Sequence, residues 1–121
     1  MPYQIKCESG VFDVPSLDVL ATFVEELIGT TGDAAYWLYS NGQIIAGFLY
    51  NGEHATVFRD SDGAEPFNPD APEDETTQIR LENGQLDDFY LQKCVSYEDA
   101  LDAFVMIATT GELTDNIQWL T

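Results

Sequence analysis

Two stretches of the chain carry apolar residues at the spacing of an amphipathic helix. The first follows Ser16, and its apolar positions are Leu17, Leu20, Val24, Leu27 and Ile28. The second follows Ser96, and its apolar positions are Tyr97, Leu101, Phe104, Val105 and Ala108. A serine before such a stretch caps the free backbone N–H groups of a first turn. Because glycine commonly terminates helices, we expect the two helices to end at Gly29 and Gly111.

Strand-like runs fill most of the chain between these stretches, and Asn-Gly pairs separate several of them. The pairs are Asn41-Gly42, Asn51-Gly52 and Asn83-Gly84. Asn-Gly between apolar runs is a strong signal for a tight antiparallel hairpin. The runs are Tyr3–Cys7, Ala34–Tyr39, Gln43–Tyr50, Glu53–Arg59, Thr76–Glu82 and Gln85–Gln92. We expect the three pairs to be hairpin turns of one antiparallel sheet.

The densest apolar run, Ala34–Tyr39, predicts a central strand that is buried on both faces. Glu8–Pro15 contains Gly10 and Pro15 and is expected to be a connector. The element order indicates an α+β fold, an antiparallel β-meander with two amphipathic helices packed on one face. With 121 residues, the chain has the length of one domain, 1–121. Core side chains are expected to include Leu20, Val24, Trp37, Leu101 and Phe104.

The chain is strongly acidic, with 22 Asp and Glu residues against four Lys and Arg residues and a formal net charge of −18. Its 45% content of hydrophobic residues is that of a folded protein, so the acidity does not indicate disorder. The negative electrostatic field of such a protein repels nucleic acids and anionic membranes and attracts basic proteins. Solubility, or a high-salt host, is the alternative explanation of the charge.

The sequence predicts a cytoplasmic protein. The first residues, Met1–Cys7, lack the basic start and apolar stretch of a signal peptide, and no run is long enough to span a bilayer. The two cysteines, Cys7 and Cys94, fall in strand-like runs and have no metal-binding spacing. We expect buried free thiols, and a contact between them is left open.

A long acidic connector, Asp60–Glu75, lies between two of the strand-like runs. Its prolines oppose helix and central strand, and long loops in compact domains are often functional. An aromatic residue among carboxylates suits an anchor in a partner's pocket. We therefore expect this connector to bind a partner, the alternative being a solvated linker. The expected partner-binding residues are Asp60, Asp62, Glu65, Phe67, Asp70, Glu73, Asp74 and Glu75.

Signals of catalysis or cofactor binding are weak. The only histidine, His54, has no accompanying nucleophile motif, and there is no glycine-rich phosphate loop or zinc pair. The run Asp60–Gly63 hints at calcium but lacks the closing glutamate of a calcium loop. Adjacent Asp87 and Asp88 would point to opposite faces of a strand, so they do not indicate the paired carboxylates of a glycosidase. We expect a binding protein with no metal, no cofactor and no enzymatic activity.

The C-terminal quarter of the chain resembles a known family. Lys93–Trp119 combines a short apolar run, Cys94-Val95-Ser96, an acidic amphipathic helix, a polar turn and Ile117-Gln118-Trp119. This arrangement resembles the first immunity-protein family of bacterial polymorphic toxin systems. The resemblance implies a cognate toxin as partner, often a nucleic-acid deaminase, and a structural role for Trp119.

A toxin that acts on nucleic acid must hold a polyanion in a basic channel, which an acidic domain can fill. The expected function is therefore that of an immunity protein, which binds and occludes a cognate basic toxin domain. An acidic DNA-mimic regulator of a nucleic-acid-binding protein is the alternative, and a small enzyme comes third.

Overall fold

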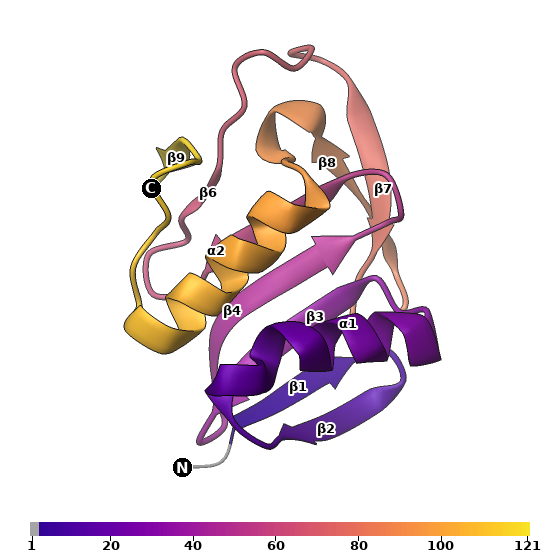
Figure 1. Cartoon of the computed structure of the whole chain (residues 1–121). Helices are drawn as coiled ribbons and strands as arrows, with labels where there is room; N and C mark the ends of the chain where they lie inside the picture. The colour runs from indigo at the N-terminus through magenta and orange to yellow at the C-terminus, as the bar shows by residue number, and fades with distance from the viewer. Residues whose placement is uncertain (1–2) are drawn as a thin grey trace.

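The computed structural model describes residues 3–121 of the chain. Five antiparallel strands form its main sheet in the order β2-β1-β3-β4-β5, with β3 at the centre (Figure 1). The strands are β1 (Tyr3–Cys7), β2 (Gly10–Val14), β3 (Ala35–Ser40), β4 (Gln43–Tyr50) and β5 (Ala55–Arg59). The central position predicted for the run Ala34–Tyr39 is confirmed, because this run forms β3.

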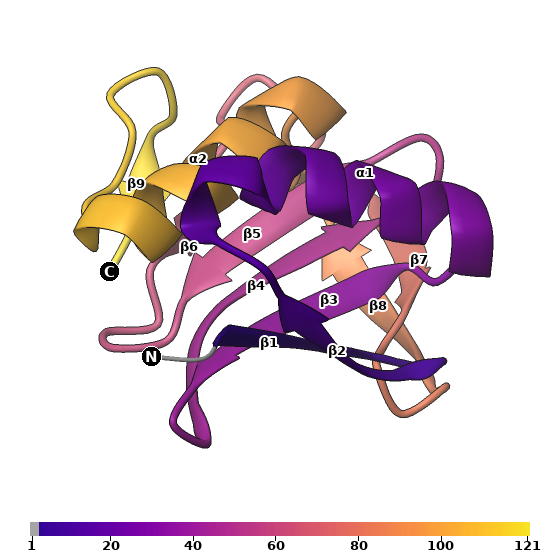
Figure 2. The ribbon, with the colours of Figure 1, turned by 60° about the horizontal axis from the view of Figure 1, so that its bottom comes forward.

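Two helices lie over the same face of this sheet (Figure 2). They are α1 (Leu20–Thr31), which follows the short 3₁₀ helix η1 (Leu17–Val19), and α2 (Tyr97–Thr110). The Ser16 hydroxyl accepts a hydrogen bond from the Asp18 N–H, and the Ser96 hydroxyl accepts one from the Asp99 N–H, at 3.0 and 3.1 Å. Gly111 ends α2 in the left-handed conformation. The predicted α+β class is confirmed, as is the Ser96 cap of α2. Ser16 caps η1, the 3₁₀ helix that leads into α1, whereas α1 itself follows Val19 without a side-chain cap.

Apolar side chains fill the space between the helices and the sheet. Of the expected core residues, Leu20, Val24, Leu101 and Phe104 are buried there. Trp37 is half-buried and belongs to the opposite face of the sheet. There it packs with Phe58 against a second, smaller cluster, whose buried members are Ala35, Leu49 and Ile79. The central strands are therefore covered on both faces, as the density of apolar residues predicts.

The second cluster is covered by a two-stranded antiparallel ribbon, β7 (Thr76–Arg80) and β8 (Leu86–Tyr90). This ribbon is a separate sheet, so the expectation that all three Asn-Gly turns belong to one sheet is wrong. The physical reason lies at the edge of β5, where Val95 and Ala64 form bridges to its two ends. Because these two bridges occupy the edge of β5, the ribbon packs on the face of the main sheet through Ile79 and Phe89.

Three further expectations are corrected. The connector Glu8–Pro15 contains β2, which pairs with β1 and places Phe12 opposite Ile5. Gly10 is the first residue of this strand and Pro15 follows its last residue, so neither interrupts it. The first helix continues through Gly29, because Gly32 is the residue that adopts the left-handed conformation at φ 70°. Cys94 lies outside the strands, at the end of η2 (Leu91–Lys93).

The C-terminus forms a last two-residue strand, β9 (Trp119–Leu120), which pairs with β6 (Glu65–Pro66). In Figure 1 these segments lie beside α2, on the opposite side of that helix from α1. The indole Nε1 of Trp119 donates a hydrogen bond to the Thr114 carbonyl at 2.9 Å. Trp119 thus fixes the tail after α2, in keeping with the structural role expected for it.

Gly47 lies opposite Trp37 on one side and Phe58 on the other in the strand register. The two rings meet edge to face across it, with centroids 5.2 Å apart. A Cβ atom at this position would lie 1.9 Å from Phe58 Cε2 and 2.6 Å from Trp37 Cε3. The missing side chain therefore makes room for the aromatic pair.

We predict that Gly47→Ala destabilises the protein by about 1–3 kcal/mol, the usual cost of overpacking. Gly29→Ala is the matched control, because a Cβ there meets nothing within 4 Å. That change should stabilise the protein by roughly 0.5–1 kcal/mol, since alanine is the better helix former. Urea unfolding measures both values, and equal stability of the two variants would contradict this view of Gly47.

Candidate partner-binding surface

The acidic connector Asp60–Glu75 is anchored along its first half. Arg59 N–H donates to the Ala64 carbonyl at 3.0 Å, and the pairing of β6 with β9 follows directly. Phe67 N–H then donates to the Gln118 carbonyl at 2.8 Å, and Asn68 N–H donates to the Gln92 carbonyl at 2.5 Å. The connector therefore follows a defined path along the C-terminal tail.

Two of the seven carboxylates in the connector are used within the chain. Asp62 accepts two hydrogen bonds from the Arg59 guanidinium, at 3.0 and 2.5 Å, and these bonds lower its pKa to about 2. The same guanidinium donates to the Gly111 carbonyl at the end of α2, at 2.8 Å. Glu65 forms an ion pair with Lys93 at 2.8 Å. These two acids are therefore paired with basic side chains of the same chain.

The other five carboxylates of the connector are exposed. They are Asp60, Asp70, Glu73, Asp74 and Glu75. Within residues 3–121, none of them has a lysine or arginine partner. Pro69 and Pro72 lie in the second half of the connector, so its four carboxylates are carried on a restricted backbone. Of the residues expected to bind a partner, these are the ones free to do so.

Phe67 is half-buried and lines an open groove of about 580 Å³. The groove lies where the connector, β8, η2 and β9 meet, and its lining includes Glu73 and Asp74. Tyr90 and Leu120 also line it, although each keeps roughly half of its surface exposed, at 52% and 43%. The structure thus brings the expected aromatic residue together with two of the expected carboxylates.

Tyr90 and Leu120 were missed in the sequence analysis. In β8, Leu86, Asp88 and Tyr90 share one face, because side chains alternate between the two faces along a strand. Their partners in β7 are Arg80, Gln78 and Thr76. That face is exposed, whereas Ile79 and Phe89 on the other face meet the main sheet. The alternation is visible in the sequence, but the face that would be covered depends on how the ribbon packs.

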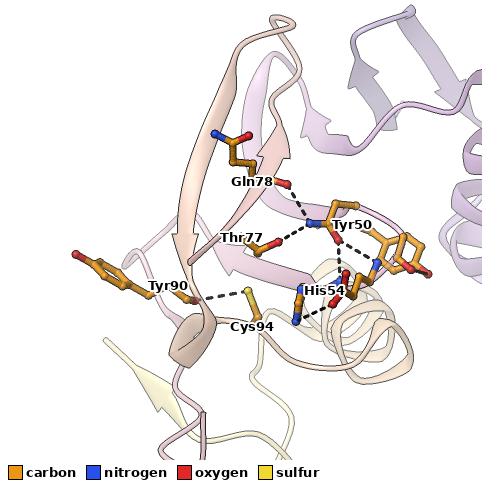
Figure 3. Close-up of polar contacts among 9 residues, drawn as sticks. Tyr50, His54, Thr77, Gln78, Tyr90 and Cys94 are labelled. Carbon is orange, nitrogen blue, oxygen red and sulfur yellow. Dashed lines mark hydrogen bonds and ion pairs between the residues drawn. The ribbon is translucent and has the colours of Figure 1, made fainter. Parts of the chain in front are cut away.

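A hydrogen-bond network fixes the ribbon at the turn between β4 and β5. The Asn51 side chain donates to the Thr77 hydroxyl and the Gln78 carbonyl, at 2.8 and 2.9 Å, both in β7 (Figure 3). Its Oδ1 accepts from the N–H groups of Glu53 and His54, at 3.0 and 2.7 Å. This asparagine therefore links the main sheet to the ribbon that carries Tyr90.

His54 and Cys94 line a small cavity next to this network. His54 Nδ1 is buried and has no hydrogen-bond partner within the described residues, and Nε2 lies 4.0 Å from Glu53 Oε1. Cys94 Sγ donates to the Tyr90 carbonyl at 3.6 Å, and burial raises the pKa of its thiol to about 11. Figure 3 shows the Tyr90 ring pointing away from this cavity. A neutral thiol is a poor nucleophile, so burial keeps Cys94 in its less reactive form.

Both cysteines of the described chain are free and buried. Burial, followed by the neighbouring Asp33 carboxylate, raises the pKa of the Cys7 thiol to about 11. Residues 3–121 contain no group of three or more His, Cys, Asp or Glu side chains that could hold a metal ion. Among the helices of the same residues, none is long and apolar enough to cross a membrane.

Comparison with known proteins gives no match, either to a protein-family model or to a curated protein.

We predict that neither thiol of the native protein reacts appreciably with Ellman's reagent at pH 8, because the reactive thiolate is suppressed by burial. The native reaction should accelerate between pH 9 and 11, as the two thiols begin to lose their protons. Both should react at once in denaturant, which serves as the control. Rapid modification of one thiol at pH 8 without unfolding would contradict the burial of that site.

Proposed function

We propose that this protein is an immunity protein that binds and occludes a cognate bacterial toxin domain acting on nucleic acid, with a deaminase as the expected class. One observation carries the proposal: every lysine and arginine side chain is already engaged by a carboxylate of the same chain. The pairs are Lys6–Glu82, Arg59–Asp62, Arg80–Glu8 and Lys93–Glu65. Of the 22 acidic side chains, four take part in these pairs, which leaves 18 without a lysine or arginine partner within residues 3–121.

A surface of this kind can compete with nucleic acid for a basic channel. Carboxylates accept charge-assisted hydrogen bonds from arginine and lysine, as phosphates do. The field of the whole molecule steers association, which can reach roughly 10⁸–10⁹ M⁻¹s⁻¹ at low salt. Fast association suits an antidote that must capture its toxin before the toxin reaches nucleic acid. Occlusion requires no chemistry from the inhibitor.

The resemblance of Lys93–Trp119 to an immunity-protein family supports the same proposal. In the structure this segment contains the capped helix α2 and the tail fixed by Trp119, so it forms a scaffold for the groove on its flank. We place the contact surface on the second half of the acidic connector and on β8. These elements carry exposed carboxylates beside exposed apolar side chains, which is the combination expected at the core and rim of an interface.

The experiment is binding kinetics against the cognate toxin domain, at low and high salt. Neutralising Asp70, Glu73, Asp74 and Glu75 to their amides should slow association at low salt, and the loss should shrink at high salt because salt screens the steering field. The matched control neutralises four exposed carboxylates on or next to the helices. They are Glu25, Glu26, Asp102 and Glu112.

Both variants change the net charge by the same amount, so a larger loss of association rate in the connector variant would indicate that the connector contacts the toxin. Equal association rates for the two variants would remove the connector from the interface. A lack of any binding to that toxin domain would overturn the proposed function. Binding to several unrelated DNA-binding proteins instead would favour the DNA-mimic alternative.

A further inference from the structure

We propose that the groove beside Tyr90 is a receptor for an arginine side chain, presented by the basic partner. The inference rests on the proposed function for the source of the arginine, but the chemistry of the groove can be tested alone. Side chains of three kinds line this groove. Phe67 and Tyr90 are aromatic, Leu120 is aliphatic, and Glu73 and Asp74 are anionic.

This combination matches a guanidinium better than other common groups. A guanidinium is planar and weakly hydrated, so it stacks on aromatic rings while its N–H groups bond to carboxylates at the edges. An ammonium is more strongly hydrated and lacks the flat face and the fork of donors. A phosphate or carboxylate ligand would be repelled by Glu73 and Asp74. The groove should therefore prefer arginine to lysine.

The one cation in the wall does not cancel this preference. Lys93 lines the groove, but its Nζ lies 2.8 Å from Glu65 Oε1, so its charge is balanced within the chain. Glu73 and Asp74 have no such partner within residues 3–121. The local balance is thus two uncompensated negative charges beside exposed aromatic surface.

The groove is also preorganised. Phe67 is held by its backbone bond to Gln118 at 2.8 Å, and the β6–β9 pairing holds Leu120. Tyr90 is held by the ribbon, which Asn51 links to the main sheet. A ligand side chain would therefore meet walls that are already in place, which lowers the entropic cost of binding. The exposed half of Tyr90 would be covered in the complex.

The test uses two capped peptides of equal charge, Gly-Arg-Gly-Arg-Gly and Gly-Lys-Gly-Lys-Gly, titrated into the ¹⁵N-labelled protein at low salt. We expect the arginine peptide to shift the amides of Tyr90, Gln92 and Leu120, and to bind more tightly than the lysine peptide. Tyr90→Ala should weaken binding of the arginine peptide by about two- to five-fold, the size of an exposed cation–π contact.

A charge-matched pair of variants separates this site from general attraction. Glu73→Gln/Asp74→Asn removes the anionic wall of the groove. Glu26→Gln/Asp102→Asn removes the same charge from the two helices, outside the lining of the groove. Only the first double variant should weaken the arginine peptide clearly. Amide spectra of all variants should keep the dispersion of the native protein, because every changed side chain is exposed.

Equal weakening by the two double variants, or equal affinity for the two peptides, would overturn the arginine site. This outcome is distinguishable from failure of the proposed function. If the toxin domain binds with unchanged affinity to Tyr90→Ala and to Glu73→Gln/Asp74→Asn, the function stands and the groove is not its receptor. If the peptides bind as expected while no toxin binds, the groove stands and its partner lies elsewhere.

Discussion

Strands β3 and β4 bury apolar side chains on both faces of the sheet, and most of the remaining structure follows from the need to cover them. Two amphipathic helices cover one face, with Val24 of α1 and Phe104 of α2 among the buried side chains. The other face is closed by a short ribbon, which adds Ile79 and Phe89 to a second cluster. Gly47 lets Trp37 and Phe58 meet within that layer. Because the ribbon lies there, Tyr90 comes to lie beside the acidic connector and the C-terminal strand.

Charge is the second constraint. The few basic side chains form ion pairs with carboxylates of the same chain. Among them, Arg59 fixes the first turn of the acidic connector and the end of α2. Exposed ion pairs of this kind contribute little to stability, typically about 0–1 kcal/mol. Their larger effect is on the field, because they leave no lysine or arginine of the described chain to neutralise the other carboxylates. A basic surface, if bound, would offset the self-repulsion that results.

Local signals in the sequence predict most of the fold, and the misses have physical causes. The serine caps, the Gly111 stop and the hairpin at Asn41-Gly42 depend on neighbouring residues, so they can be read directly. A glycine can lie within a helix or end it, so the sequence does not distinguish Gly29, which lies inside α1, from Gly32, which ends it. The separate ribbon depends on which sheet edges are already occupied, and this is a property of the whole fold. The positions of Tyr90 and Leu120 depend on the whole fold in the same way, so the sequence does not predict their role. Phe67, Glu73 and Asp74 can be predicted because they lie in an acidic connector that contains prolines.

Competition with nucleic acid is the critical experiment for the proposed occlusion, since occlusion requires that both ligands use one channel. The measurement is the fluorescence anisotropy of a labelled single-stranded oligonucleotide bound to a catalytically inactive form of the toxin domain. Adding this protein should displace the oligonucleotide completely at about one equivalent of protein per toxin. A stable ternary complex, in which the anisotropy stays high while this protein is bound, would contradict the account.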